Sequence, residues 1–189
     1  MILSLFIRNK EFYLSSNGFE QFCKIDAPRG LADKVPDVFK TFIGQINFSE
    51  IDTILYSSGP ASFTTARIMN SMLKGIKVAC PDMRFVGISH FVTYLSIVMK
   101  QHEQGTIAIP TMRGDYFMCR FVGSQLEKMY ISNEVLNDNV ISSNSPILTN
   151  INLATQQYCV SNIDILKRNT SFITYDLEIE YGITPEYSH

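Results

Sequence analysis

The sequence is poor in charged side chains, which make up 18% of its residues, and its formal net charge is −2. Nothing in this overall charge suggests a surface dedicated to nucleic-acid phosphates, so any RNA contact would need a local basic patch or another subunit. Hydrophobic residues amount to 46% and aromatic residues to 12%, which is ample for a packed core. We therefore expect part of the surface to be apolar and to face a partner.

Long apolar runs are also missing, since no stretch approaches the roughly 20 residues that a membrane-spanning helix needs. The apolar segment 1–8 has no basic region before it and no small-residue cleavage site after it, which indicates a first strand rather than a signal peptide. The cysteines lack a CxxC pair and metal-site spacing, so we expect buried free thiols in a cytoplasmic protein. They are Cys23, Cys80, Cys119 and Cys159.

Signatures of metal and nucleotide sites are absent as well. The three histidines, His90, His102 and His189, are dispersed, and each is expected at the surface or at a helix end rather than as a metal ligand. The sequence contains neither a GxGxxG pattern nor a Walker sequence ending in Gly-Lys-Ser/Thr. We predict no metal, no cofactor and no catalytic residue.

Strands and helices alternate over the first hundred residues. Polar turns at Arg8-Asn9-Lys10 and Asn17-Gly18 predict two successive hairpins, and apolar spacings of three and four predict the helices. Pro36 is expected to kink its helix or to delay the helix start. The expected strands are 2–8, 11–15, 19–25, 51–56 and 84–88, and the expected helices are 31–46, 62–79 and 89–101. This order is typical of an actin-like or ribonuclease H-like α/β lobe with a mixed sheet.

The second half carries a weaker pattern. Strands are expected at 106–111, 116–122, 128–132 and 158–165. Residues 137–157 have a loop-like composition, rich in Asn, Ser and Thr. The polar run 101–105 separates two predicted lobes, residues 1–103 and 104–189.

The loop 57–64 joins a predicted strand to a predicted helix that Ser62 would cap. Such a loop can cradle a phosphate at the helix N-terminus. It can equally be a tight turn in which Gly59 and Pro60 have their usual roles. The pattern alone favours the turn.

The helix 62–79 has an unusually wide apolar side, with an arc of roughly 160° where a one-sided surface helix shows a little over 100°. The residues on this arc are Ile68, Met69, Met72, Leu73, Ile76 and Ala79. Two apolar neighbours are therefore expected, its own sheet and something else. The second neighbour is either the helix 31–46 of this chain or a partner, and both helices can contribute to one interface.

The segment from Gly59 to Arg67, Gly-Pro-Ala-Ser-Phe-Thr-Thr-Ala-Arg, resembles the Gly-Pro-Gly-Ser-Phe-Thr-Gly-x-Arg motif of the TsaB (YeaZ) family. Ala61 and Thr65 replace two glycines of that motif. Weaker likenesses lie at 87–89, 113–116 and 185–187, so the resemblance covers most of residues 25–120 and the extreme C-terminus. TsaB proteins are non-catalytic paralogues of TsaD, the tRNA threonylcarbamoyl-transferase subunit.

The sequence also departs from the family. Members commonly end their first strand in Asp-Thr-Ser, whereas residues 4–10 here contain no carboxylate. The usual aspartate of the second-lobe strand corresponds to Pro110. A chain without these acids cannot easily transfer phosphoryl or carbamoyl groups, so a scaffold is expected.

The resemblance implies a two-lobed actin-like (ASKHA) fold with a reduced second lobe. It implies a scaffold and dimerisation subunit that supports a TsaD-type catalytic subunit and a TsaE-type ATPase in making N6-threonylcarbamoyladenosine at tRNA position 37. Contact with tRNA would occur only through this complex, and a homodimer could form when the chain is alone.

The same resemblance predicts a partner interface on the helices 31–46 and 62–79. Its expected residues are Phe42, Phe63, Arg67, Met69, Met72 and Leu73, and the motif loop comprises Gly59, Pro60, Ser62 and Thr64. Two alternatives stay open: residual nucleotide-hydrolase or peptidase activity, and a self-associating module without a tRNA role.

Overall fold

The computed structural model describes residues 1–8, 11–16, 19–24, 30–111, 113–133, 140–142 and 163–175. The chain forms two compact units, one containing Met1–Gly87 and the other Ile88–Thr174. Within the described residues, no helix is both long and apolar enough to cross a membrane.

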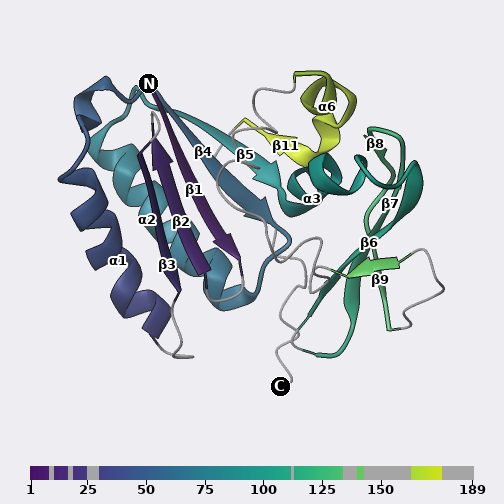
Figure 1. Ribbon diagram of the computed structural model, residues 1–189. Helices are drawn as coiled ribbons and strands as arrows, with labels where there is room; N and C mark the ends of the chain where they lie inside the picture. The colour runs from purple at the N-terminus through teal and green to yellow at the C-terminus, as the bar shows by residue number, and fades with distance from the viewer. Residues whose placement is uncertain are drawn as a thin grey trace. The chain divides into compact units, whose positions relative to one another are not determined.

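The first unit is built on a mixed sheet (Figure 1). Its strands are β1 (Ile2–Arg8), β2 (Glu11–Ser16), β3 (Phe19–Lys24), β4 (Thr53–Gly59) and β5 (Arg84–Ser89). They are arranged in the order β5-β4-β1-β2-β3. The hairpins β1–β2 and β2–β3 are antiparallel, whereas β1 and β4 are parallel. Two hairpins followed by a helical crossover to a parallel strand give the actin-like, ribonuclease H-like arrangement that the sequence predicted.

Two helices, α1 (Gly30–Ile43) and α2 (Phe63–Ala79), lie side by side on one face of this sheet (Figure 1). A short 3-10 helix, η1 (Phe48–Glu50), follows α1. The expected delay at Pro36 does not occur, because α1 begins six residues earlier and Pro36 lies inside it with an exposed side chain. The helix ends at Ile43 rather than at residue 46, since Gln45 and Ile46 donate to carbonyls three residues back.

The core of the first unit lies between the sheet and these helices. Alternate residues of β1, namely Leu3, Leu5 and Ile7, are fully buried in one apolar cluster, as the two-residue period of a strand requires. Ile54 and Tyr56 of β4 join the same cluster. Each such side chain contributes roughly 1.5–3 kcal/mol when fully buried, so this layer fixes where the helices sit.

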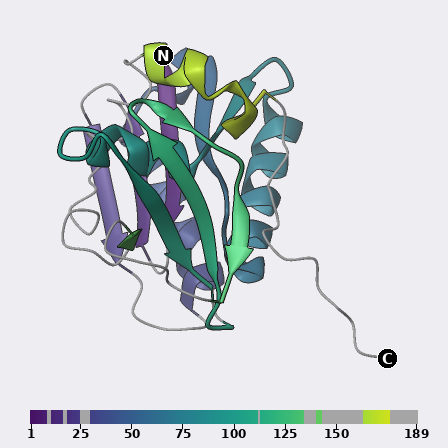
Figure 2. The ribbon, with the colours of Figure 1, turned by 90° about the vertical axis from the view of Figure 1, so that its right-hand side faces the viewer.

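The second unit combines a smaller sheet with the buried helix α3 (His90–Val98). Its strands are β6 (Gln104–Pro110), β7 (Tyr116–Val122), β8 (Gln125–Leu126), β9 (Tyr130–Ser132) and β10 (Val140–Ser142). The strand order is β10-β6-β7-β8, with β9 also paired to β7. The long antiparallel β6–β7 hairpin dominates the view in Figure 2. The unit ends with α6 (Ile163–Arg168), η2 (Thr170–Phe172) and β11 (Ile173–Thr174).

Three sequence expectations for this region need correction. The units divide between Gly87 and Ile88 rather than near residue 103, because α3 packs against α6, β6 and β8. The strand expected at 158–165 is wrong over its described part, since residues 163–165 begin α6. Strand β10 lies inside the segment whose composition suggested a loop, and it pairs in parallel with β6.

Candidate partner interface

An apolar groove of about 680 Å³ runs between α1 and α2. Its wall on α1 includes Val35, Phe39 and Ile43, whose spacing of four residues fits the apolar period that predicted this helix. Thirteen of the described residues line the groove: Ala32, Val35, Pro36, Phe39, Ile43, Phe48, Arg67, Ile68, Ser71, Met72, Gly75, Ile76 and Ala79. Only Arg67 and Ser71 among them are polar, so the groove offers a surface suited to another apolar side of a protein.

The wide apolar arc of α2 divides between two environments. Met69 and Leu73 face inward and belong to the core cluster under the sheet. Ile68 and Met72 are only partly buried and line the groove. The sequence left open whether the second apolar neighbour of α2 is the helix α1 or a partner. In the structure α1 lies beside these apolar residues but does not cover them completely, because a groove remains between the two helices.

Three of the predicted interface residues belong to the core instead. Phe42 and Leu73 are 0% exposed and Met69 is 2% exposed. This corrects the expectation that they contact a partner. A side chain with almost no exposed surface has none left to bury against another protein. Their apolar character comes from packing within the first unit, which sequence periodicity cannot distinguish from an interface stripe.

The other three predicted residues are accessible. Met72 and Arg67 line the groove, and the Phe63 side chain is 43% exposed. The Arg67 guanidinium lies over the Phe63 ring, 4.9 Å from its centroid. This cation–π contact restricts both side chains at the end of the groove where α2 begins.

The motif loop connects β4 to α2. Gly59 has a φ of 118°, a left-handed backbone region that strongly favours glycine. Pro60 follows it and is buried. These two residues turn the chain sharply, while Thr64 is exposed on the first turn of the helix.

Ser62 caps α2 as predicted. Its hydroxyl oxygen accepts a hydrogen bond from the Thr65 backbone N–H at 3.2 Å and lies 2.8 Å from the Thr65 hydroxyl. An anion at this helix terminus would compete with the Ser62 hydroxyl for that N–H. The geometry therefore favours the strand-to-helix turn over the phosphate cradle.

Gly75 is a groove residue that the sequence-based interface omitted. A Cβ added to Gly75 would meet no atom within 4 Å, so the groove is open above this position. Val78, one turn beyond Lys74, is 85% exposed. The signal that could have identified Gly75 is its place among the apolar residues of α2, but a glycine adds nothing to a hydrophobic pattern.

The described residues offer little evidence for a metal site or a reactive thiol. No three His, Cys, Asp or Glu side chains among them gather as metal ligands would. Burial raises the pKa of the Cys119 thiol to about 12, which suppresses the reactive thiolate. His90, the first residue of α3, is buried.

Comparison with known proteins supports the fold. No family model and no curated protein matches the sequence. The structure of YeaZ from Pseudomonas aeruginosa superposes with a TM-score of 0.53 at 16% identity, covering 70% of this chain and 64% of that one. A second Pseudomonas aeruginosa structure, described as an uncharacterized protein with similarity to peptidase YEAZ, gives 0.53 at 17% identity over 70% and 63% of the two chains.

A Bacteroides thetaiotaomicron protein with an actin-like ATPase fold and unknown function superposes with a TM-score of 0.40 at 15% identity, covering 69% of each chain. The matches to the two Pseudomonas proteins span less than two thirds of the length of those proteins. At such low identity, the likeness to these two structures concerns the fold. The likeness to the two Pseudomonas structures confirms the expected α/β fold class.

Proposed function

We propose that this protein is a non-catalytic scaffold subunit of the TsaB type, which binds a TsaD-type catalytic subunit through the groove between α1 and α2. In this role it supports, together with a TsaE-type ATPase, the formation of N6-threonylcarbamoyladenosine at position 37 of tRNA. It contacts tRNA only through the complex.

The apolar groove is the observation that carries this proposal. Eleven of its thirteen lining residues are apolar, and exposed Phe63 belongs to the same helix. Grooves of this kind accept the apolar stripe of a helix from a partner, with anchors at spacings of three and four. A scaffold needs such a surface but needs no reacting groups.

The motif and the fold support the identity of the partner. The Gly59–Arg67 segment resembles the TsaB motif, and the fold is like that of YeaZ. The loop performs a structural task that fits a scaffold. Gly59 and Pro60 turn the chain, and Ser62 then caps the start of α2, whose residues line the groove together with those of α1.

Gly75→Glu tests the proposed interface. The new side chain enters open space, so the fold should persist while a carboxylate occupies the groove and blocks an apolar helix. Co-purification with the TsaD-type subunit from the same genome should fall at least about tenfold, as measured by pull-down and by titration of the purified proteins. Charges at Met69 or Leu73 would instead unfold the core and test nothing.

Thr41→Glu is the matched control. Thr41 is an exposed residue of α1 that does not line the groove, and the substitution adds the same charge. Binding should stay within about twofold of the unmodified protein. Equal binding by the Gly75→Glu protein, with an unchanged melting temperature, would refute the groove as the interface.

A further inference from the structure

Among the described residues that line the groove, Arg67 alone is charged. It belongs to the second turn of α2, next to Ile68 and one turn before Ser71. The other lining residue with a polar side chain, Ser71, carries no charge. The groove is therefore apolar along most of its length and cationic at the end where α2 begins.

The contacts of the described residues restrict the Arg67 guanidinium but do not neutralise its charge. The central carbon of the guanidinium lies over the Phe63 ring, 4.9 Å from the ring centroid. Within the described part of the chain, no carboxylate lies within salt-bridge distance of Arg67. Helix α2 itself contains no aspartate or glutamate, and its other charged residues are Lys74 and Lys77.

A partner that fills the groove must remove water from one side of this guanidinium. Burial of an unpaired charge is strongly unfavourable. A carboxylate placed against the guanidinium removes that penalty and forms two parallel hydrogen bonds. Because Phe63 already restricts the arginine, little conformational entropy remains to be lost on pairing.

We infer that the groove selects a partner helix whose apolar stripe ends in a carboxylate, an aspartate or glutamate that pairs with Arg67. The inference rests on the proposed function and specifies the chemistry of its partner. The apolar stripe supplies contact area, whereas the carboxylate fixes the direction and register of the docked helix.

A second copy of this chain satisfies that requirement less well. The acidic residues of its two helices, Asp33 and Asp37, both lie on α1 outside the groove lining. Its α2 would bring Lys74 and a second Arg67 instead. The charges thus favour a different protein over self-pairing.

The test measures the dissociation constant of the TsaD-type subunit from the same genome at 50 mM and 500 mM salt. Arg67→Met keeps the apolar stem but removes the charge. Binding should weaken about 30-fold or more at low salt, because the carboxylate of the partner is left unpaired. The loss should be smaller at high salt, where the unmodified protein also binds more weakly.

Two further variants separate charge from packing. Arg67→Lys retains the charge without the planar fork, so it should bind between the unmodified protein and Arg67→Met. Arg67→Glu should abolish binding, and one acidic-to-lysine substitution on the partner should restore it. That lysine identifies the pairing carboxylate.

The outcomes distinguish this inference from the function on which it rests. If Gly75→Glu abolishes binding while Arg67→Met stays within about twofold at both salt concentrations, the groove is the interface but the carboxylate inference is wrong. If neither variant changes binding, the proposed interface itself is wrong. Restoration of Arg67→Glu by a partner lysine supports both.

Discussion

A single buried amide organises the end of the second unit. The Asn169 side chain accepts a hydrogen bond from the Leu126 N–H at 2.7 Å and donates to the carbonyls of Ser124 at 2.9 Å and Ile165 at 2.7 Å. It is 1% exposed. This one residue therefore joins β8 to the end of α6.

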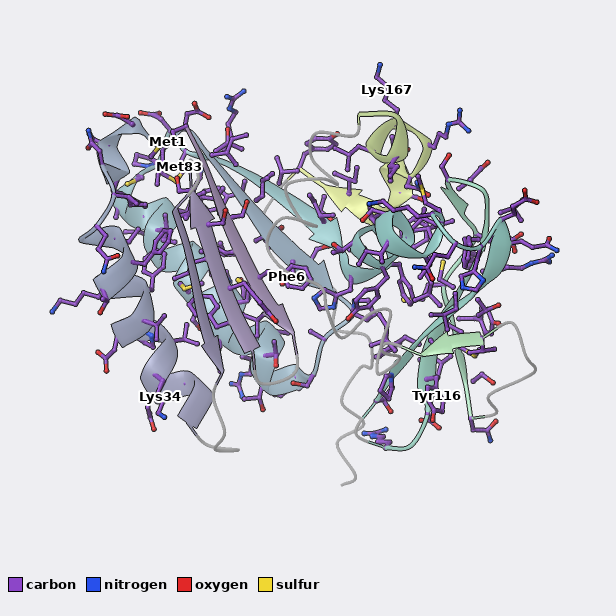
Figure 3. All side chains as sticks on the ribbon, in the orientation of Figure 1. Met1, Phe6, Lys34, Met83, Tyr116 and Lys167 are labelled. Carbon is purple, nitrogen blue, oxygen red and sulfur yellow. The ribbon has the colours of Figure 1, made fainter. Side chains whose placement is uncertain are left out.

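Asn169→Ala should lower the free energy of unfolding by about 1–3 kcal/mol, because the buried bonds to the Leu126 N–H and the Ile165 carbonyl are lost, together with the part-buried bond to the Ser124 carbonyl. Urea denaturation followed by circular dichroism measures the change. Lys167→Ala is the control, since Lys167 projects from α6 into solvent (Figure 3), and it should shift stability by less than about 0.5 kcal/mol. Equal stability of both variants would contradict the role assigned to Asn169.

Residues differ in how far the sequence could predict them. Ser62 was predictable, since a cap bonds to an N–H only three residues away. Asn169 was not, because its partner Leu126 lies 43 residues away in sequence. Phe42, Met69 and Leu73 were correctly seen as apolar, but their side of the helix was decided by packing against a distant sheet.

At the scale of elements, two glycines of the first unit should respond to alanine in opposite ways. Gly75 lies within α2 with open space around its Cα, so Gly75→Ala should stabilise the protein by about 0.5–1 kcal/mol. At Gly87, in β5, a Cβ would lie 2.7 Å from the Tyr56 ring and 2.9 Å from the Ser58 Cβ. Gly87→Ala should therefore destabilise it by about 1–3 kcal/mol.

The two midpoints of urea unfolding provide the measurement, and each variant is a control for the other. If both alanine variants raised the midpoint, or both lowered it, the space around each added Cβ would not be what governs their stability. Both residues are glycines in regular elements, so sequence alone gives no reason to separate them.

Among elements, local signals predicted the first unit better than the second. Its hairpins followed from short polar turns, and its helices from apolar spacing over several turns. In the second unit, Ile163, Ile165 and Leu166 form an apolar group too short to distinguish a strand from a helix by period. Their helix, α6, packs against α3 and β8, which are distant in sequence.

At the scale of the whole molecule, the uncovered groove should lead to weak self-association. A free chain exposes the groove together with Phe63 and Val78, and apolar surfaces of this kind associate when no partner covers them. The mass measured by light scattering after size exclusion should rise with concentration. Gly75→Glu should reduce this rise, and Thr41→Glu should not.

A mass that stays monomeric at every concentration would contradict this expectation, whereas a stable dimer at low concentration would favour a second copy as the partner in the groove. The association of copies should be weaker than that with the proposed partner, because the described residues that line the groove of a second copy offer Arg67 no carboxylate.

The division of the chain could not be read from composition. The polar run at 101–105 suggested a boundary, but α3 is buried along its length within the second unit. A helix that is mostly apolar indicates burial without indicating which unit surrounds it. Contacts with residues distant in sequence decide which unit surrounds α3, and no local sequence pattern reports those contacts.

The divided arc of α2 has a consequence for how this helix can evolve. Substitutions at Met69 and Leu73 act on folding, so selection removes them whether or not a partner is present. Ile68 and Met72 pack only partly against the core and also line the groove, and Gly75 lies above open space, so substitutions at these positions act less on folding and more on binding. The two stripes of one helix thus evolve under separate pressures, and the groove stripe is free to change in step with the helix that occupies it.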